Sequence, residues 1–282
     1  MLKQIYNLRP YSWIDLFLLG FVAKFSVTRS LSFVYSDIIM VISLFFLWCF
    51  FSLVLEYKHN YDYRAKSSIL LLIISIIIPL VIIFYNPSTG IFFLFLTFFV
   101  TLYLFKNKNK SLGNFSIIFR GLAQSSYFFY ALMLYTNSIN YLQLIIAISI
   151  FLLYSSRSLI GDLRDVKHNK GTNKKTFVVN YGVKLSIVLV EIILVLCIIC
   201  LMQIFNILVF FPLILFGTTI LFFRNGYVLH QLIIIVTSFI SINLIITLTS
   251  NTLIFSNLIF VGLFLNMIFY PLLQRKSNPE FK

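Results

Sequence analysis

Arg157-Ser-Leu-Ile-Gly-Asp162-Leu-Arg164-Asp165-Val-Lys-His-Asn169-Lys-Gly-Thr-Asn-Lys174-Lys175-Thr176-Phe-Val-Val-Asn-Tyr-Gly182 is a polar stretch between two long apolar runs. It holds two of the chain's eight acidic residues among six Lys or Arg residues. On one helix, Asp162, Asp165 and Asn169 stand at i, i+3 and i+7, so their side chains would share a face. Oxygen ligands beside several cations predict a place where a divalent metal holds a phosphate. Because the bilayer begins about one helical turn away, the pattern indicates chemistry on an amphipathic phosphate such as a prenyl diphosphate.

The composition predicts a membrane protein. Of 282 residues, 60% are apolar and 11% are charged, which is far more apolar surface than a soluble domain of this size needs. We expect an all-α, polytopic transmembrane bundle formed by a single domain, residues 1–282. The net charge of +14 would suggest nucleic acid as a partner of a soluble protein. Here the excess of Lys and Arg in cytoplasmic loops explains it, so no nucleic acid is expected, and no protein partner is indicated.

Ten stretches are long and apolar enough to span a bilayer core of about 30 Å. Two of them have almost no connector between them, so nine spans with one bent or re-entrant segment are an alternative to ten. The candidates are 12–29, 32–55, 68–86, 90–105, 115–135, 141–160, 184–204, 206–223, 227–249 and 252–272.

Lys and Arg residues alternate between the connectors and set the orientation. They occur in the N-terminal segment, in 56–67, 106–114 and 157–184, at Arg224 and in the C-terminal tail. The connectors near 87–89, 136–140, 205 and 250–251 contain none, and only Lys24 and Arg29, around the first connector, break the alternation. The positive-inside rule then places both termini and both mixed polar loops, 56–67 and 157–184, on the cytoplasmic side of the plasma membrane.

The order of residues from Arg157 to Gly182 resembles the second aspartate-rich motif of the UbiA superfamily of intramembrane prenyltransferases. In that family an Arg precedes three spaced aspartates, a Gly-Lys-Lys/Arg-Thr stretch follows, and a Gly opens the next helix. Asn169 stands here in place of the third aspartate. Arg9-Pro10 before the first span, and polar loops after the second and sixth spans, are also similar to the family.

The first motif of the family falls after the second span and is degenerate. In register with its Asn-Asp pair and two further aspartates stand Ser52, Leu53, Glu56 and Asn60. Ser52, Glu56 and Asn60 still share a helical face, but only Glu56 is a carboxylate, and Leu53 cannot bind a metal. The chain therefore offers Mg²⁺ three carboxylates, or four if Asp62, two residues after Asn60, takes part, which is fewer than the family offers.

The resemblance implies roles for individual residues. Asp162, Asp165 and Glu56 would be catalytic and would hold Mg²⁺, helped by Asn60 and Asn169. Cations would bind the diphosphate and offset the missing carboxylates. These cations are Lys58, Arg64, Lys66, Arg157, Lys174 and Lys175.

Two further charged residues lie inside predicted spans. Glu191 is an intramembrane carboxylate, so it is a candidate for acceptor binding, with an interhelical hydrogen bond as the alternative. Arg120 either snorkels to the headgroups or reaches the site, where it would contact phosphate or acceptor.

The function implied is transfer of a prenyl group from a prenyl diphosphate to a lipophilic aromatic or lipid acceptor in the membrane. One alternative is a divergent, non-catalytic UbiA-like protein that binds lipid phosphate. A lipid-phosphate transporter is a further alternative, although the paired broken helices of such transporters are not evident in the sequence. The acceptor and the length of the prenyl chain stay open.

The charge pattern makes a prediction about topology. Single cysteines at Asn60, Asn109 and Asn169 should react with a membrane-impermeant thiol reagent only from the cytoplasmic side, and cysteines at Ser88 and Asn137 only from outside. Labelling of Asn60 and Asn169 from opposite sides would contradict both the orientation and the shared site.

Overall fold

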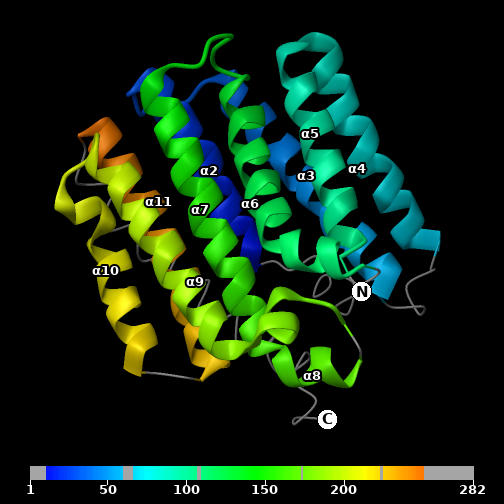
Figure 1. Ribbon diagram of the computed structural model, residues 1–282. Helices are drawn as coiled ribbons and strands as arrows, with labels where there is room; N and C mark the ends of the chain where they lie inside the picture. The colour runs from blue at the N-terminus through cyan, green and yellow to red at the C-terminus, as the bar shows by residue number, and fades with distance from the viewer. Residues whose placement is uncertain (1–10, 60–65, 107–108, 173, 223–224, 251–282) are drawn as a thin grey trace.

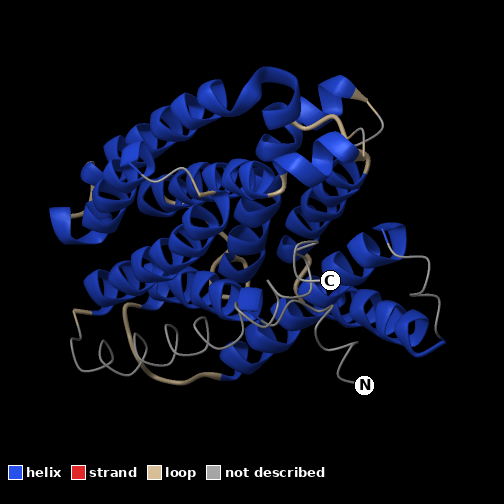
Figure 2. Cartoon of the chain, turned by 90° about the horizontal axis from the view of Figure 1, so that it is seen from below, coloured by secondary structure: helices blue, strands red, loops and turns tan. Residues whose placement is uncertain are grey.

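The computed structural model describes residues 11–59, 66–106, 109–172, 174–222 and 225–250. Within these ranges the chain is helical and contains no strand (Figure 2). The predicted all-α transmembrane bundle is confirmed. The long helices are α2 (Tyr11–Thr28), α3 (Tyr35–His59), α4 (Lys66–Tyr85), α5 (Ser88–Leu104), α6 (Lys110–Leu132), α7 (Tyr141–Arg164), α9 (Phe177–Met202), α10 (Ile207–Phe222) and α11 (Gly226–Thr249), with the short α8 (Val166–Gly171) between α7 and α9.

Each of the first nine predicted spans corresponds to one helix, and the tenth candidate, 252–272, lies outside the described residues. The two stretches with almost no connector form separate helices, α9 and α10, joined by a turn at 203–206. Four helices, α3, α7, α9 and α11, contain segments long and apolar enough to cross a membrane by length and composition. Asparagines start several helices; the Asn140 side chain, for example, accepts a hydrogen bond from the backbone N–H of Gln143 in a capping box.

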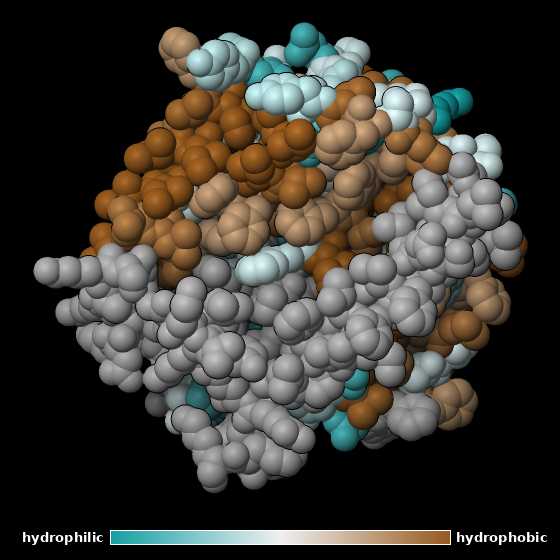
Figure 3. Space-filling model, turned by 180° about the vertical axis from the view of Figure 1, so that it is seen from behind, coloured by the Kyte–Doolittle hydropathy of each residue, from teal (hydrophilic) through white to brown (hydrophobic). Residues whose placement is uncertain are grey.

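Helices α6 and α7 lie side by side at the centre of the bundle, with α2 packed against both (Figure 1). Helices α3, α4 and α5 extend the bundle on the α6 side, and α9, α10 and α11 extend it on the α7 side. The outward faces of α4, α5 and α9 expose large apolar side chains, and hydrophobic atoms cover a broad area of the face in Figure 3. An apolar surface of this extent fits lipid and not water, so the chain is a membrane protein.

Two connectors without basic residues lie together at one end of the bundle, and Lys106 lies at the other; the α2–α3 connector, which carries Arg29, shares the first end. At one end, Ser88 Oγ is 3.0 Å from Asn137 Oδ1, which joins the start of α5 to the α6–α7 connector. At the other end, Lys106 after α5 contacts Asp162 in the last turn of α7, and α8 follows there (Figure 1). This arrangement agrees with the predicted alternation.

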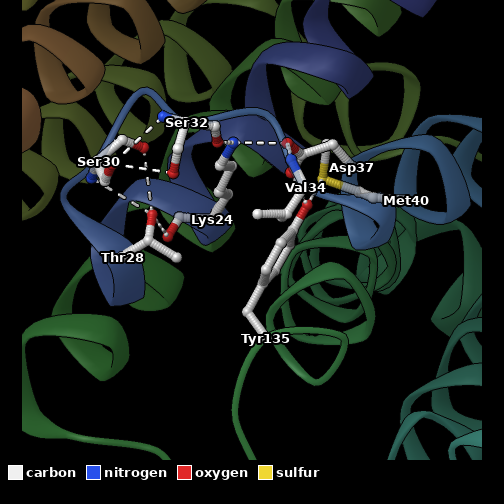
Figure 4. A network of polar contacts seen from close by, with 8 residues as sticks. All are labelled: Lys24, Thr28, Ser30, Ser32, Val34, Asp37, Met40 and Tyr135. Carbon is white, nitrogen blue, oxygen red and sulfur yellow. Dashed lines mark hydrogen bonds and ion pairs between the residues drawn. The ribbon is translucent and has the colours of Figure 1, made fainter.

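A buried ion pair joins α2 to α3 at the end of the bundle opposite α8. Lys24 of α2 is 2.6 Å from Asp37 of α3, and both residues are almost fully buried. Lys24 also donates to the Ser32 carbonyl in the α2–α3 connector, while Tyr135, just after α6, donates to the second Asp37 oxygen at 2.6 Å (Figure 4). The pair makes three further hydrogen bonds, with the Ser32 carbonyl, the Val34 N–H and Tyr135, and these hold two connectors together.

We predict that Lys24→Met destabilises the protein by about 3–5 kcal/mol, because it leaves the Asp37 carboxylate buried without its cation. Thermal unfolding of the detergent-solubilised protein measures the effect. The double variant Lys24→Met/Asp37→Asn should recover part of the loss, and Lys184→Met, at an exposed site on α9, is the matched control. Equal unfolding temperatures for Lys24→Met and Lys184→Met would contradict the role of the pair.

Candidate functional site

The predicted catalytic residue Asp162 lies in the last turn of α7, where it is 6% exposed. The Lys106 ammonium lies 3.5 Å from its Oδ1 and also donates to the Tyr103 hydroxyl at 3.0 Å. Within the described residues, Oδ2 of Asp162 is buried and has no hydrogen-bond partner. A carboxylate with one oxygen paired and the other left without a partner is suited to an additional cation.

From the sequence, Lys106 contributes only to the charge pattern that predicts the topology, because it belongs to no motif and lies 56 residues before Asp162. Burial alone would lower the pKa of its ammonium, but the Asp162 carboxylate and Tyr103 outweigh burial, and the net pKa is raised. Lys106 therefore stays charged across the physiological pH range. It brings a permanent positive charge to the motif.

The second motif is not one continuous helix, and this corrects the prediction that its three oxygen-bearing residues share a helical face. Helix α7 ends at Arg164, Asp165 adopts φ −94° and ψ 11°, and Asn169 belongs to α8. Arg164 binds both oxygens of Asp165, at 2.8 and 2.7 Å. The start of α11 packs on the end of α7, since a Cβ on Gly226 would lie 2.8 Å from Arg164 Cα, and the chain turns away there.

Lys174 is half-buried and is influenced electrostatically by Asp162 and Asp165, whereas the Lys175 side chain is exposed. Burial and the nearby Lys106 ammonium lower the pKa of Lys174, although the two carboxylates oppose this. The loop lies directly on α6: a Cβ added to Gly113 would be 1.5 Å from the Lys175 carbonyl oxygen. Gly113 is therefore what allows the lysine pair to approach the bundle.

The family motif predicts that Gly182 opens the next helix. In the structure one helical turn precedes Gly182, and the long continuous part of the helix follows it. Helix α9 begins at Phe177, and Gly182 interrupts it with φ 86° and ψ 168°. This conformation is essentially restricted to glycine.

The described residues contain no group of three His, Cys, Asp or Glu side chains that could hold a metal ion. The unpartnered oxygen of Asp162 and the adjacent Asp165 are nevertheless ligands of the type that Mg²⁺ prefers. These two residues fit a metal only with ligands from elsewhere, such as the predicted first motif. Asn169 is buried in α8, one turn after Asp165.

Most of the first motif cannot be placed. The side chains of Glu56, Lys58 and Lys66, and all of Asn60 and Arg64, lie outside the described residues. Of the two residues that can be placed, Leu53 packs in an apolar cluster with Cys49, Leu71 and Leu72. Leu53 therefore belongs to the seam between α3 and α4, in agreement with the inference that it binds no metal.

Arg157, predicted to bind the diphosphate, is engaged in the bundle core. Its guanidinium donates to Asp15 of α2 at 2.6 Å, and the other Asp15 oxygen accepts from Ser238 of α11 at 2.7 Å. This network connects α2, α7 and α11. A contact between Arg157 and diphosphate stays a prediction.

The two speculative acceptor residues are far from equivalent. Arg120 points into the bundle, with its guanidinium carbon 4.5 Å from the buried Phe51 ring and 5.4 Å from the buried Trp48 ring, so it does not snorkel to the headgroups. Glu191 faces α10, where a Cβ on Gly217 would lie 3.2 Å from its Oε2. Its Oε1 is buried without a partner among the described residues, so the interhelical hydrogen bond is not observed there.

UbiA homologues are among the solved structures that share this arrangement of helices. A UbiA homologue from Archaeoglobus fulgidus bound to Cd²⁺ superposes with a TM-score of 0.68 at 15% identity, over 88% of this chain and 100% of that one. The chain has the UbiA fold. A digeranylgeranylglyceryl phosphate synthase matches with a TM-score of 0.64 at 17% identity, over 89% of this chain and 99% of that one. The A. fulgidus homologue bound to GPP and Mg²⁺ gives a TM-score of 0.61 at 15% identity, over 88% of this chain and 100% of that one.

Neither protein-family models nor curated proteins match the chain. The solved structures nevertheless confirm, at the level of the fold, the resemblance seen in the second motif.

Gly113→Ala should displace the Lys174–Lys175 loop, because the new methyl group cannot coexist with the Lys175 carbonyl at 1.5 Å. We expect trypsin to cleave after Lys174 or Lys175 several-fold faster than in the parent, measured by mass spectrometry of the solubilised protein. Gly171→Ala is the matched control, because a Cβ there meets nothing within 4 Å. Equal cleavage rates in the two variants would show that the loop does not depend on this contact.

Proposed function

We propose that this protein transfers a prenyl group from a prenyl diphosphate to a lipophilic acceptor within the membrane. The observation that carries the proposal is Asp162, buried at the end of α7 with one oxygen unpartnered among the described residues and with two lysines beside it. UbiA homologues with this fold have been solved bound to GPP and DMAPP with Mg²⁺, which supports a prenyl diphosphate as the substrate.

Breaking the bond between the allylic carbon and the diphosphate oxygen leaves its electron pair on the diphosphate. Lys106 and Lys174, both next to Asp162, stabilise the negative charge that develops there. Lys58, Arg64, Lys66, Arg157 and Lys175 are the further proposed diphosphate ligands. The acceptor's nucleophilic atom then forms a new bond to the allylic carbon and loses its proton.

Mg²⁺ would be held by Asp162 and Asp165, with Glu56, Asn60 and Asn169 completing the proposed ligand set. When bound, it supplies positive charge that neutralises the diphosphate leaving group. The role of Asp162 and Asp165 is to hold the leaving group at the end of α7, next to Lys106.

A second candidate is a UbiA-like protein that binds a lipid phosphate without catalysis. It is favoured by the Lys106–Asp162 contact, since a lysine already neutralises a carboxylate that a metal would need. Such a site would bind an anionic headgroup through Lys106 and Lys174 without breaking a bond.

We further propose the plasma membrane as the location, with both termini and both motif loops on the cytoplasmic side. The alternation of basic connectors supports this orientation. Lys106, Asp162 and α8 share one end of the bundle, which would then face the cytoplasm.

Asp162→Asn and Lys106→Gln should each reduce magnesium-dependent release of diphosphate from GPP on the order of 100-fold or more. Asp162→Asn removes a proposed ligand of Mg²⁺, and Lys106→Gln removes a cation beside the leaving group. Release is measured on purified protein supplied with a membrane lipid extract as the source of acceptor. Lys170→Gln, at an exposed position of α8, removes the same charge as Lys106→Gln and should have little effect.

Unfolding temperatures of all three variants show whether they remain folded. Release at the wild-type rate from folded Asp162→Asn would show that the loop is structural. If the wild type releases no diphosphate yet binds GPP with an affinity that depends on Lys106, the non-catalytic candidate is correct.

A further inference from the structure

The starts of α6 and α9 meet at the α8 end of the bundle and carry an exposed group of basic and aromatic side chains (Figure 1). Lys110 opens α6, and its ammonium lies over the ring of Tyr181 in α9, 6.0 Å from the ring centre. Lys184 follows three residues after Tyr181, and all three side chains are exposed. We call Lys110, Tyr181 and Lys184 the α6–α9 basic surface. None of the three has a part in the proposed cleavage step.

The positive charge of this surface is not neutralised within the described part of the chain. Each described aspartate is already paired with another cation; the four cations are Lys24, Lys106, Arg157 and Arg164. The described glutamate on α9, Glu191, is directed at α10. Lys110 and Lys184 therefore present their charge to the surroundings of the protein, where an external anion is complementary to them.

A chain of hydrogen bonds ends at the Tyr181 hydroxyl. The Asn180 amide donates to the side-chain oxygen of Asn114 at 2.7 Å, and the Asn114 amide donates to the Tyr181 oxygen at 3.3 Å. A phenol has one proton of its own, and the described residues provide no acceptor for it. The hydroxyl can therefore donate to an anion that Lys110, over the same ring, attracts.

The α6–α9 basic surface is separate from the contact between Lys106 and Asp162. The Lys106 side chain turns inward, where it is 14% exposed and contacts Asp162 and Tyr103. Lys110, four residues later, is exposed and lies over Tyr181 instead. The two lysines therefore serve different places, one inside the bundle and one on its outer surface.

An apolar stripe continues from this surface along α9. Beyond Lys184, large apolar side chains are exposed at intervals of three or four residues, so they line one face of the helix. They are Leu185, Val188, Ile192, Val195 and Ile199. Tyrosine is typical of the interface between membrane and water, where its ring lies in lipid and its hydroxyl among the headgroups. A basic end followed by an apolar face matches the two parts of a phospholipid.

We propose that the α6–α9 basic surface binds the headgroup of an anionic phospholipid, whose acyl chains lie along the apolar stripe of α9. The phosphodiester oxygens accept hydrogen bonds from Lys110, Lys184 and the Tyr181 hydroxyl. A zwitterionic phospholipid brings an ammonium group as well, which the two lysines repel, so the surface selects lipids of net negative charge. This inference does not depend on the proposed prenyl transfer.

Lipid binding is measured by native mass spectrometry of the purified full-length protein in a neutral detergent. The protein is titrated with phosphatidylglycerol or with phosphatidylcholine of the same acyl chains, and the fraction of protein that carries one lipid gives the affinity. Phosphatidylglycerol should bind at least tenfold more tightly. A large excess of inorganic phosphate should not displace it, because free phosphate has no acyl chains to pack on α9.

Single substitutions locate the binding site. Lys110→Gln and Lys184→Gln should each weaken binding of phosphatidylglycerol about fivefold, which corresponds to about 1 kcal/mol. Tyr181→Phe keeps the ring, removes the donor and should weaken binding several-fold. Lys170→Gln, at an exposed position of α8, removes the same charge and is the matched control, with little effect expected. Unfolding temperatures show that each variant remains folded.

Equal affinity for the two lipids would overturn the proposal, and so would equal weakening by Lys110→Gln and Lys170→Gln, which indicates diffuse attraction to a basic protein. Displacement by inorganic phosphate would show a site for a free anion and not for a lipid. Weakening by Lys106→Gln but not by folded Lys110→Gln would place the lipid in the proposed diphosphate site. Asp162→Asn should abolish diphosphate release and leave lipid binding intact, so the two proposals fail separately.

Discussion

Charged side chains inside a lipid-embedded bundle must be neutralised by other parts of the protein, and this constraint organises the structure. Three ion pairs meet it: Lys24 with Asp37, Arg157 with Asp15, and Lys106 with Asp162. Each joins separate elements, and the partners of the second are 142 residues apart. Removing one member leaves a buried charge, which costs far more than the intact pair contributes. The pairs therefore specify which helices are neighbours more than they add stability.

The predictable part of the fold came from local pattern. Apolar stretches of sufficient length gave nine described helices near their predicted positions, because backbone groups in lipid must be paired within the segment. The charge pattern separated the contacts at Ser88 and at Lys106 into opposite ends of the bundle, with Arg29 as an exception. The order of residues after Arg157 indicated the UbiA fold, which the solved structures bear out at 15–17% identity.

The site was only partly predictable, because its remaining members are brought in by tertiary contacts. Lys106 follows a different helix from Asp162, and no spacing rule connects them. Asp15 belongs to no motif of the sequence, yet it is the partner of Arg157. The helical face assumed for Asp162, Asp165 and Asn169 failed because packing of α11 on the end of α7 overrides the helical period. Gly113 carried no signal either, since its role depends on a loop more than sixty residues later.

The small number of carboxylates in the first motif and the position of Lys106 both bear on how positive charge is supplied to a diphosphate. A diphosphate leaving group needs positive charge close to it, and either metal ions held by carboxylates or lysines can supply that charge. A metal requires several acidic ligands, each costly to bury, whereas Lys106 needs only Asp162 and a tyrosine hydroxyl to remain charged in a buried place. In the proposed mechanism, Lys106 and Lys174 supply part of the positive charge that metal ions held by further carboxylates would otherwise supply. Under that proposal, Leu53 can pack between α3 and α4 while the lysines still attract phosphate.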